Sequence, residues 1–464
     1  MDAVGSYIKQ PTVKLPVVVV PYPGRGHINP LLNFCHLLSS RLNQPNRTTV
    51  FTIVVTEEWL GIIDPDRKQA NNNILFAAIP NVLPSELNRG SNMITFLTAV
   101  RTKMQRPFEE VIDQMELPVK LIIADATMLW PFEVANRRNI PVAAYWPMSA
   151  SMFSLMHHID LLESHNHLYV DESERGHEHI DYIPGIPSLT IADMPMVFHA
   201  KYGEMFKGLV PNLAEVTKKA NYVLLSTIYE LESKVIDALR SKLQIPVYTC
   251  GLNIPYSQIE PNLESYDYGL INWLDSKPLG SVLYVSFGSY LPVSSAEMGE
   301  IAAGLAQSGV YFLWVARGET SCLKEMCGEK GMMVDWCDQL RVLLHPSIGG
   351  FWSHCGWNSV KESMFSGVPM LTFPISLDQP LNSKAIVENW KIGWNIRKEI
   401  RDIERDKIAE VARKFMDSKN VESLGMMERV KQVQEICQES GSSEEDLKSF
   451  VNDMVTNQSS QCIC

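Results

Sequence analysis

The sequence lacks an excess of positive charge, because 41 lysine and arginine residues stand against 53 aspartate and glutamate residues, a formal net charge of −12. Nucleic acids and anionic membranes bind basic surfaces, so we expect neither as a partner. Long hydrophobic runs are also missing near the start. The strongest, residues 15–20, contains Pro16 and is followed by Pro21. A membrane span needs about 20 apolar residues, so we expect no stable membrane insertion.

The marks of an exported, disulfide-bonded protein are missing too. No charged segment with an apolar core and a small-residue cleavage site precedes residue 15, although a secretory signal peptide would show that pattern. The nine cysteines are odd in number and scattered, unlike the framework of a small secreted domain. We therefore expect a cytoplasmic protein with reduced thiols.

The chain does contain enough apolar residues for two cores, since 45% of its 464 residues are hydrophobic. Short apolar runs alternate with helical patterns, which predicts an α/β fold of two Rossmann-like, doubly wound domains facing a central cleft. The expected strands are residues 17–20, 50–55, 74–79, 121–124 and 142–145 in the first half, and 282–286, 312–315, 332–334, 349–352 and 369–373 in the second.

Composition indicates where the two domains divide. Residues 253–268 are rich in proline, asparagine, serine and acidic residues, which is typical of a linker. We place the boundary near Gly251, with residues 1–250 in the first domain and 251–441 in the second. The apolar spacing in the last segment predicts a helix over about 442–464, which we expect to pack back on the first domain.

Residues 336–379 have the pattern strand, turn, helix, strand. A helix is expected to begin at Trp357, directly after a tight turn that ends at Gly356. Free backbone amides at a helix N-terminus bind anions, so this turn is a candidate diphosphate site. Side chains that can add hydrogen-bond donors there are those of His354, Asn358 and Ser359.

The same stretch has side chains suited to the rest of a nucleotide sugar. Glu362 lies one turn into the helix, where a carboxylate can accept both hydroxyls of a ribose. Trp336 offers a flat face to a base, with the Gln339 amide nearby, and Asp378 with Gln379 suits the vicinal hydroxyls of a sugar. Each has an ordinary alternative as core residue, surface charge or helix cap, but their combination at these spacings favours a site.

A catalytic pair is predicted at two strand ends. His27 follows the first strand in a glycine-rich stretch, before a helix expected to begin near Asn29, and Asp125 follows the strand at 121–124. Open α/β sheets bind ligands at these carboxyl edges. A histidine can take the proton of an alcohol nucleophile, and a carboxylate can orient its ring. The alternative is a helix-start residue and a helix N-cap.

Residues 336–379 resemble, at essentially every diagnostic position, the plant secondary-product signature of family 1 UDP-glycosyltransferases. The resemblance implies a GT-B fold and a monomer that transfers a sugar from a UDP-sugar to a small-molecule acceptor with inversion. It assigns His27 as general base and Asp125 as its charge-stabilising partner, and the closing Gln379 favours glucose. The donor-binding residues it implies are Gly26, Ser289, Trp336, Cys337, Gln339, His354, Gly356, Trp357, Asn358, Ser359, Glu362, Asp378 and Gln379.

The acceptor pocket is expected in the first domain, for a hydrophobic molecule with a hydroxyl or carboxyl group. Its candidate residues, which are equally good core residues, are Tyr145, Phe153, His157 and Leu377. The sequence departs from the family at Pro147, where many members carry a hydroxyl that meets the donor sugar.

We expect no metal and no other cofactor. Residues 164–183 hold four histidines, but they predict a mobile surface loop without the fixed geometry of a metal site. Asp64-Pro65-Asp66 matches the short motif of metal-dependent glycosyltransferases and is better explained as a solvated turn. Two other functions stay open: a nucleotide-dependent oxidoreductase, although the third glycine of the dinucleotide fingerprint is missing, and a non-catalytic sugar-nucleotide binder.

Overall fold

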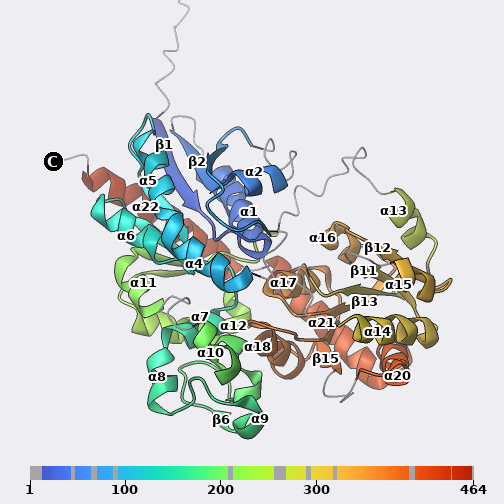
Figure 1. Ribbon diagram of the computed structural model, residues 1–464. Coiled ribbons are helices and arrows are strands. Elements are labelled where there is room, and N and C mark those ends of the chain that lie inside the picture. The colour runs from blue at the N-terminus through green and yellow to red at the C-terminus, as the bar shows by residue number, and fades with distance from the viewer. Residues whose placement is uncertain are drawn as a thin grey trace, which may run out of the picture.

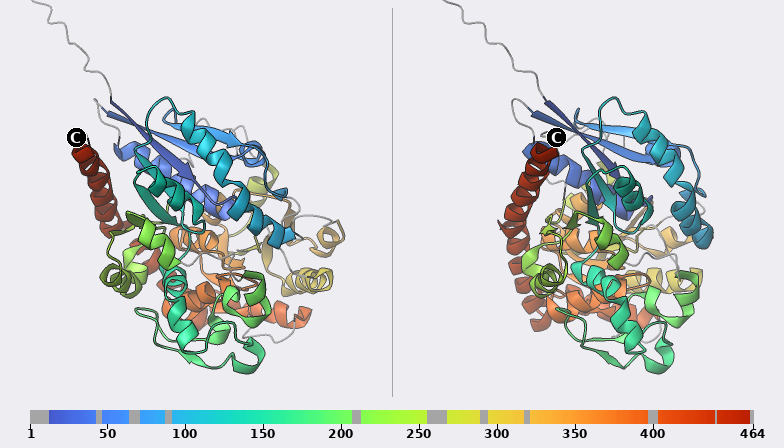
Figure 2. Two further views of the ribbon diagram at one scale, coloured as in Figure 1. Left: turned by 60° about the vertical axis from the view of Figure 1, so that its left-hand side comes forward. Right: turned by 90° about the vertical axis from the view of Figure 1, so that its left-hand side faces the viewer.

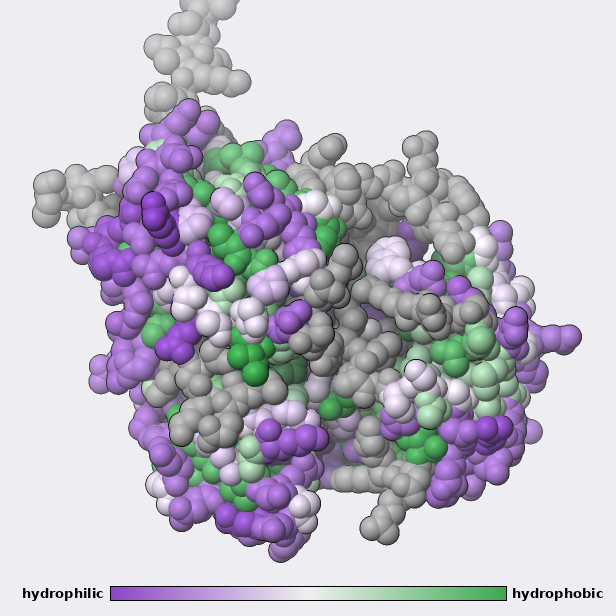
Figure 3. All heavy atoms as spheres, viewed as in Figure 1, coloured by the Kyte–Doolittle hydropathy of each residue, from purple (hydrophilic) through white to green (hydrophobic). Residues whose placement is uncertain are grey.

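Two parallel β-sheets covered by helices form two lobes in the computed structural model of the protein (Figure 1). It describes residues 13–42, 47–63, 71–86, 92–206, 213–254, 268–288, 294–316, 321–396, 403–439 and 441–461. The space-filling view shows that the molecule is hollowed between the two lobes (Figure 3). The predicted α/β class with two doubly wound units is confirmed.

The N-terminal sheet has seven strands in the order β3-β2-β1-β4-β5-β8-β9, and all of its pairs are parallel. Its strands are β1 Val13–Val20, β2 Arg47–Thr56, β3 Ile74–Ile79, β4 Leu121–Asp125, β5 Val142–Trp146, β8 Tyr222–Leu225 and β9 Val247–Thr249. Side chains alternate between its faces, so Val18 and Val20 join one apolar cluster and Val17 and Val19 the other. Both faces are therefore buried, as parallel sheets require.

Helices cover both faces of this sheet and connect its strands. They are α1 Arg25–Leu42, α2 Glu57–Ile62, α4 Met93–Lys103, α5 Gln105–Asp113, α6 Trp130–Arg137, α7 Ala150–His157, α8 Ile159–Ser164, α11 Leu213–Lys219 and α12 Tyr229–Lys242. Helix α1 begins at Arg25, earlier than the expected start near Asn29. Pro30 therefore lies in the second turn of the helix and not at its start.

The C-terminal sheet has six strands in the order β12-β11-β10-β13-β14-β15, again all parallel. Its strands are β10 Val282–Ser286, β11 Tyr311–Val315, β12 Gly331–Val334, β13 Ile348–Ser353, β14 Met370–Thr372 and β15 Gly393–Asn395. The helices are α13 Tyr268–Asp275, α14 Ser295–Ser308, α15 Ser321–Met326, α16 Gln339–Leu343, α17 Trp357–Ser366, α18 Gln379–Lys384, α20 Arg405–Met416 and α21 Val421–Glu439.

The last helix, α22 Gly441–Gln461, returns to the N-terminal lobe and runs along its side (Figure 2). Its residues Leu447, Phe450 and Met454 share an apolar cluster with Tyr222 and Tyr248. Among the described residues, no helix combines the length and the apolar character needed to cross a membrane.

Residues 164–183 are largely exposed, as expected of a surface loop, and they also form short regular elements. They contain α9 Glu172–Arg175 and β6 His179–Ile180, which pairs with β7 Leu189–Thr190. The histidine side chains stabilise this region: His167 Nδ1 lies 2.9 Å from the Tyr182 hydroxyl, and the His165 ring stacks on Tyr182. Two short 3₁₀ helices, η2 Ile191–Asp193 and η3 Met196–Phe198, lead into α10 Ala200–Phe206.

Candidate active site

His27 and Asp125 meet where the N-terminal sheet reverses its strand order. Strands β1 and β4 are neighbours, and the two residues follow β1 and end β4, at the position where open α/β sheets bind ligands. His27 Nδ1 lies 2.8 Å from Asp125 Oδ2. The Asp125 side chain is fully buried, whereas 21% of the His27 side chain is exposed. This leaves Nε2 as the ring nitrogen available to a substrate.

The partners of Asp125 and His27 fix the imidazole ring. Asp125 Oδ1 accepts hydrogen bonds from the backbone N–H and the hydroxyl of Thr127, at 3.0 and 2.5 Å. The Tyr22 ring lies 4.9 Å from the His27 ring, between centroids. Thr127 thus holds the Asp125 carboxylate through Oδ1, and Oδ2 of the same carboxylate can orient the His27 ring.

The helix that starts beside His354 touches the helix that carries His27. Asn358, in the first turn of α17, donates from Nδ2 to the carbonyl oxygen of Gly26 at 2.9 Å. That carbonyl is free because Pro30, four residues later in α1, has no N–H to donate to it. The two candidate half-sites therefore line one crevice.

Asp378 lies within electrostatic reach of the same histidine. Burial raises the pKa of the Asp378 carboxyl, while its hydrogen bond from Asn382 and the charge of His27 act in the opposite direction. Asn382 Nδ2 donates to Asp378 Oδ2 at 2.8 Å. Asp378, in the segment that follows β14, thus lies close to His27, in the segment that follows β1.

The His354 ring lies against two glycines, Gly288 and Gly356, where any side chain would collide with it. A Cβ atom on Gly288 would lie 2.8 Å from His354 Nε2, and one on Gly356 would lie 2.6 Å from it. Burial lowers the pKa of His354 to about 4, so the ring is neutral at pH 7. A neutral imidazole has a single N–H, which here bonds to the Ser286 backbone, so His354 can donate to a diphosphate beside the N-terminus of α17 by exchanging that partner, without adding charge.

Two of the side chains expected to meet the nucleoside, those of Gln339 and Glu362, are hydrogen-bonded to each other. Trp336 is 62% exposed, which leaves its indole free for stacking. Gln339 Nε2 donates to Glu362 Oε2 at 2.7 Å and to Ser359 Oγ at 2.9 Å. The Cys337 side chain is buried against Tyr284, so only the backbone of Cys337 can face a ligand. Ser289 lies outside the described residues, as do Asp64 to Asp66 and most of the expected linker.

Two expected sugar contacts use their side chains elsewhere. The buried Trp357 indole donates to the carbonyl oxygen of Ser226 at 2.9 Å, so this side chain joins the lobes instead of facing the sugar. Gln379 Oε1 accepts from the backbone N–H groups of Ile375 and Ser376, both at 2.8 Å. Only the amide nitrogen of Gln379 keeps capacity for a hydroxyl.

Two of the four expected acceptor residues are fully buried core residues. Tyr145 is buried on the opposite face of β5, stacked on Phe34, and its hydroxyl accepts from Asn253. Phe153 is buried in the core against Trp146. His157 is the last residue of α7 and is half-buried, and burial lowers its pKa to about 4. Leu377, 45% exposed beside Asp378, is the one that can reach a substrate.

In the described part of the chain, no three histidine, cysteine, aspartate or glutamate side chains gather as they would around a metal ion. The histidines of residues 164–183 instead bond to Tyr182, Glu178 and Ser188. We assign no metal role to them.

Residues 81–429 match the protein family described as "UDP-glucoronosyl and UDP-glucosyl transferase". The chain is 45% identical to UDP-glycosyltransferase 87A2 of Arabidopsis thaliana and 44% identical to 87A1, over 94% of this chain and 96% and 99% of the relatives. The chain belongs to this family. This chain also has the fold of Medicago truncatula UGT71G1 complexed with UDP-glucose. The two are 27% identical, with a TM-score of 0.78 over 95% of this chain and 98% of UGT71G1.

A second solved structure, Os79 from O. sativa in complex with UDP, matches with a TM-score of 0.79 over 94% of this chain and all of that one, at 24% identity. Plant glycosyltransferases of the GT-B class thus share the two-lobed architecture described above. The predicted family and fold class are confirmed.

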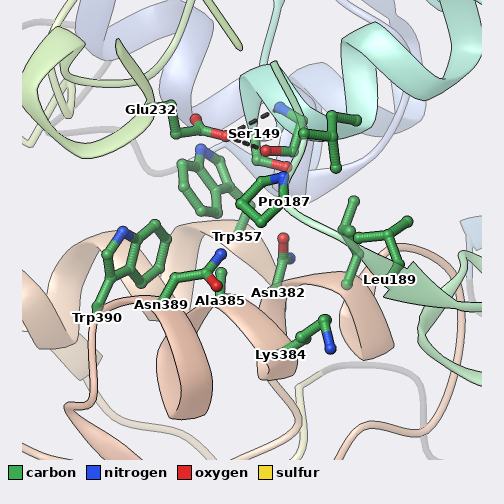
Figure 4. A pocket seen from close by; sticks show the side chains of 13 residues that line it. Ser149, Pro187, Leu189, Glu232, Trp357, Asn382, Lys384, Ala385, Asn389 and Trp390 are labelled. Atoms are coloured by element: carbon green, nitrogen blue, oxygen red, sulfur yellow. Dashed lines mark hydrogen bonds between the residues drawn. The ribbon is translucent and has the colours of Figure 1, made fainter. Parts of the chain in front are cut away.

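The UDP-glycosyltransferase has contacts between its lobes that sequence reasoning missed. Ser226, just after β8, accepts from the Trp357 indole through its carbonyl oxygen and from Lys361 Nζ through its hydroxyl, at 2.8 Å. A small pocket lies beside them, with Trp357 facing Glu232 and Ser149 of the N-terminal lobe (Figure 4). No sequence pattern points to Ser226, because it lies 135 residues from Lys361 and β8 was not predicted.

Proposed function

We propose that the protein is an inverting glycosyltransferase that moves glucose from UDP-glucose to a hydroxyl or carboxyl group of a small hydrophobic plant metabolite. The observation that carries the proposal is the 2.8 Å contact between His27 Nδ1 and Asp125 Oδ2, across the crevice from the start of α17. A base and an anion site facing each other are the two parts that sugar transfer from a nucleotide requires.

In the proposed reaction, His27 Nε2 takes the proton of the acceptor while the acceptor oxygen attacks the anomeric carbon. The bond to the UDP oxygen breaks on the opposite face, so configuration inverts. Asp125 keeps the ring oriented and stabilises the imidazolium that forms. The N-terminus of α17 and neutral His354 stabilise the negative charge of departing UDP, which would make a metal unnecessary.

Glucose as the sugar rests on Gln379 and on kinship with UGT71G1, whose structure was determined with UDP-glucose. We propose Glu362 as the ribose ligand and Trp336 as the residue that stacks on the base, because both side chains are at least partly exposed to solvent. Exposed Leu377 suits a hydrophobic acceptor near His27. We further propose that the protein acts as a monomer in the cytoplasm.

The test is product analysis with purified protein, a set of UDP-sugars, and a mixture of phenolic, terpenoid and carboxylic acceptors. We expect acceptor-dependent release of UDP, fastest from UDP-glucose, and a β-glucoside by NMR coupling constants. An α-linked product would contradict inversion. Binding of UDP-glucose without transfer to any acceptor would favour a non-catalytic binder.

A further inference from the structure

We propose that residues 191–198 of the N-terminal lobe, hereafter the strap, position residues 377–379 of the other lobe, hereafter the sugar loop. The strap acts chiefly through the backbone N–H of Met196. The strap comprises η2, Met194, Pro195 and η3. The inference rests on the proposed function, in which Asp378 and Gln379 hold the transferred sugar. It adds positioning groups that do not themselves touch substrate.

The first contact lies next to Asp378. The N–H of Met196 donates to the carbonyl oxygen of Leu377 at 3.0 Å. Leu377 has a φ of +55°, in the left-handed region that bulky side chains rarely adopt. Such a conformation persists when surrounding structure holds it in place. The strap supplies one of these restraints from the opposite lobe.

The second contact lies at the other end of α18. Lys384, the last residue of this helix, places Nζ 3.0 Å from Asp193 Oδ2. Both side chains are largely buried, so solvent screens the pair less than a surface ion pair. The same Oδ2 accepts from the N–H and hydroxyl of Thr190, which fixes its position. Figure 4 shows Lys384 below Leu189 of the N-terminal lobe.

The dimensions of the strap match those of α18. Six residues of α-helix rise about 9 Å. Met194 and Pro195 have extended backbones, with ψ of 153° and 139°, so the three steps from Asp193 to Met196 also cover about 9 Å. The strap can therefore hold Leu377 at one end of the helix and Lys384 at the other.

The strap is itself fixed to the N-terminal lobe. The N–H groups of Ile191 and Ala192 donate to the carbonyl oxygens of Glu178 and Gly176, both at 3.0 Å. His199 Nε2 lies 3.1 Å from the carbonyl oxygen of Ile191. A rigid strap transmits the position of the N-terminal lobe to the sugar loop, so it links closure of the lobes to sugar binding.

Met196→Pro tests the first contact because it removes the N–H donor. Met196 is the first residue of a 3₁₀ turn, where proline is well accommodated. Pro195 already has the extended conformation that a residue before proline adopts, with φ of −56° and ψ of 139°. Met196→Ala is the matched control, since it loses the side chain but keeps the N–H.

We expect Met196→Pro to raise the KM for UDP-glucose about tenfold above that of Met196→Ala, as for loss of one hydrogen bond. Affinity for UDP, which has no sugar, should stay the same in both. Equal KM values in the two variants, or a parallel loss of UDP affinity, would each overturn the proposal.

Lys384→Met tests the second contact, with Lys384→Arg as the conservative variant and Glu388→Gln as the control for the exposed partner of Lys384. We expect a selective loss of UDP-glucose affinity only in Lys384→Met, and equal losses in Lys384→Met and Glu388→Gln would overturn the role of Asp193. Calorimetry of UDP-glucose without acceptor keeps this test separate from activity. A wild-type protein without transfer refutes the proposed function, whereas active wild type with unchanged strap variants refutes only the strap.

Discussion

The carbonyl oxygen of Gly26 accepts a hydrogen bond from Asn358 Nδ2 at 2.9 Å, although 332 positions separate the two residues. The bond joins the helix that carries His27 to the helix whose N-terminus is the proposed diphosphate site. Pro30 favours this bond, because any other residue at that position would offer its own N–H to the same carbonyl and compete with Asn358 for it.

Pro30→Ala should therefore strengthen α1 but weaken the contact between the lobes. We expect kcat/KM to fall about 3- to 10-fold, the worth of one hydrogen bond. In an Asn358→Ala background the same substitution should have no further effect, because the contact is already gone. Steady-state kinetics of the four proteins make the comparison, and additive losses would contradict the link between Pro30 and Asn358.

Asp125→Asn keeps the size of the side chain but removes the charge that stabilises the imidazolium. We expect kcat to fall by roughly 10²- to 10⁴-fold, with little change in UDP affinity. Thr127→Val, which removes one of two hydrogen bonds to Asp125 Oδ1, should cost far less. Comparable losses of kcat in the two variants would point to a structural role for Asp125.

Gly356→Ala should reduce UDP affinity at least tenfold. The backbone of Gly356, with φ of −61°, would accept alanine, so the effect comes from the 2.6 Å approach of the new Cβ to His354 Nε2. Gly299→Ala is the matched control, since its Cβ meets nothing within 4 Å. Calorimetric titration with UDP compares the two, and unchanged affinity in Gly356→Ala would remove His354 from the diphosphate site.

Lys361→Met should stabilise the protein most at low pH. Burial lowers the pKa of Lys361 from 10.5 to about 7, so the unfolded chain binds its proton more tightly than the folded protein. The free energy of unfolding therefore rises with pH between about 7 and 10.5, and the full penalty applies below pH 7. Methionine removes the penalty at the expense of the hydrogen bond to Ser226.

Urea unfolding at pH 6 and pH 9.5 measures this effect, with exposed Lys431→Met as the control. The gain from Lys361→Met should be larger at pH 6 by an amount on the order of a few kcal/mol. The same offset at both pH values would show that Lys361 does not titrate as burial predicts.

Sequence patterns predicted most strands of both sheets, because buried parallel strands form continuous apolar runs. Strands β8, β9 and β15 were missed, since their three or four residues form short runs without a clear pattern. The residues of 336–379 that meet near His354 were predictable because one strand, turn and helix bring them together. Contacts such as Asn358 with Gly26 were not, because they arise only when the lobes meet.

The acceptor residues failed for a related reason. In a strand buried on both faces, every side chain is apolar, so the sequence does not indicate which face of the sheet a residue occupies. Tyr145 lies on the face that packs against Phe34 of α1. Apolar periodicity on α7 identifies a buried face without saying whether that face meets a ligand or the core, so Phe153, which packs on Trp146, was misplaced. Leu377 stays a prediction, and its exposed side chain is consistent with a role at the acceptor.

The central claim is that His27 acts as the base in a crevice whose opposite wall binds UDP. The most direct measurement is single-turnover transfer from UDP-glucose by His27→Ala, with calorimetry of UDP on the same preparation. We predict at least a 100-fold slower transfer and unchanged affinity for UDP. Transfer at the wild-type rate by His27→Ala would contradict the account.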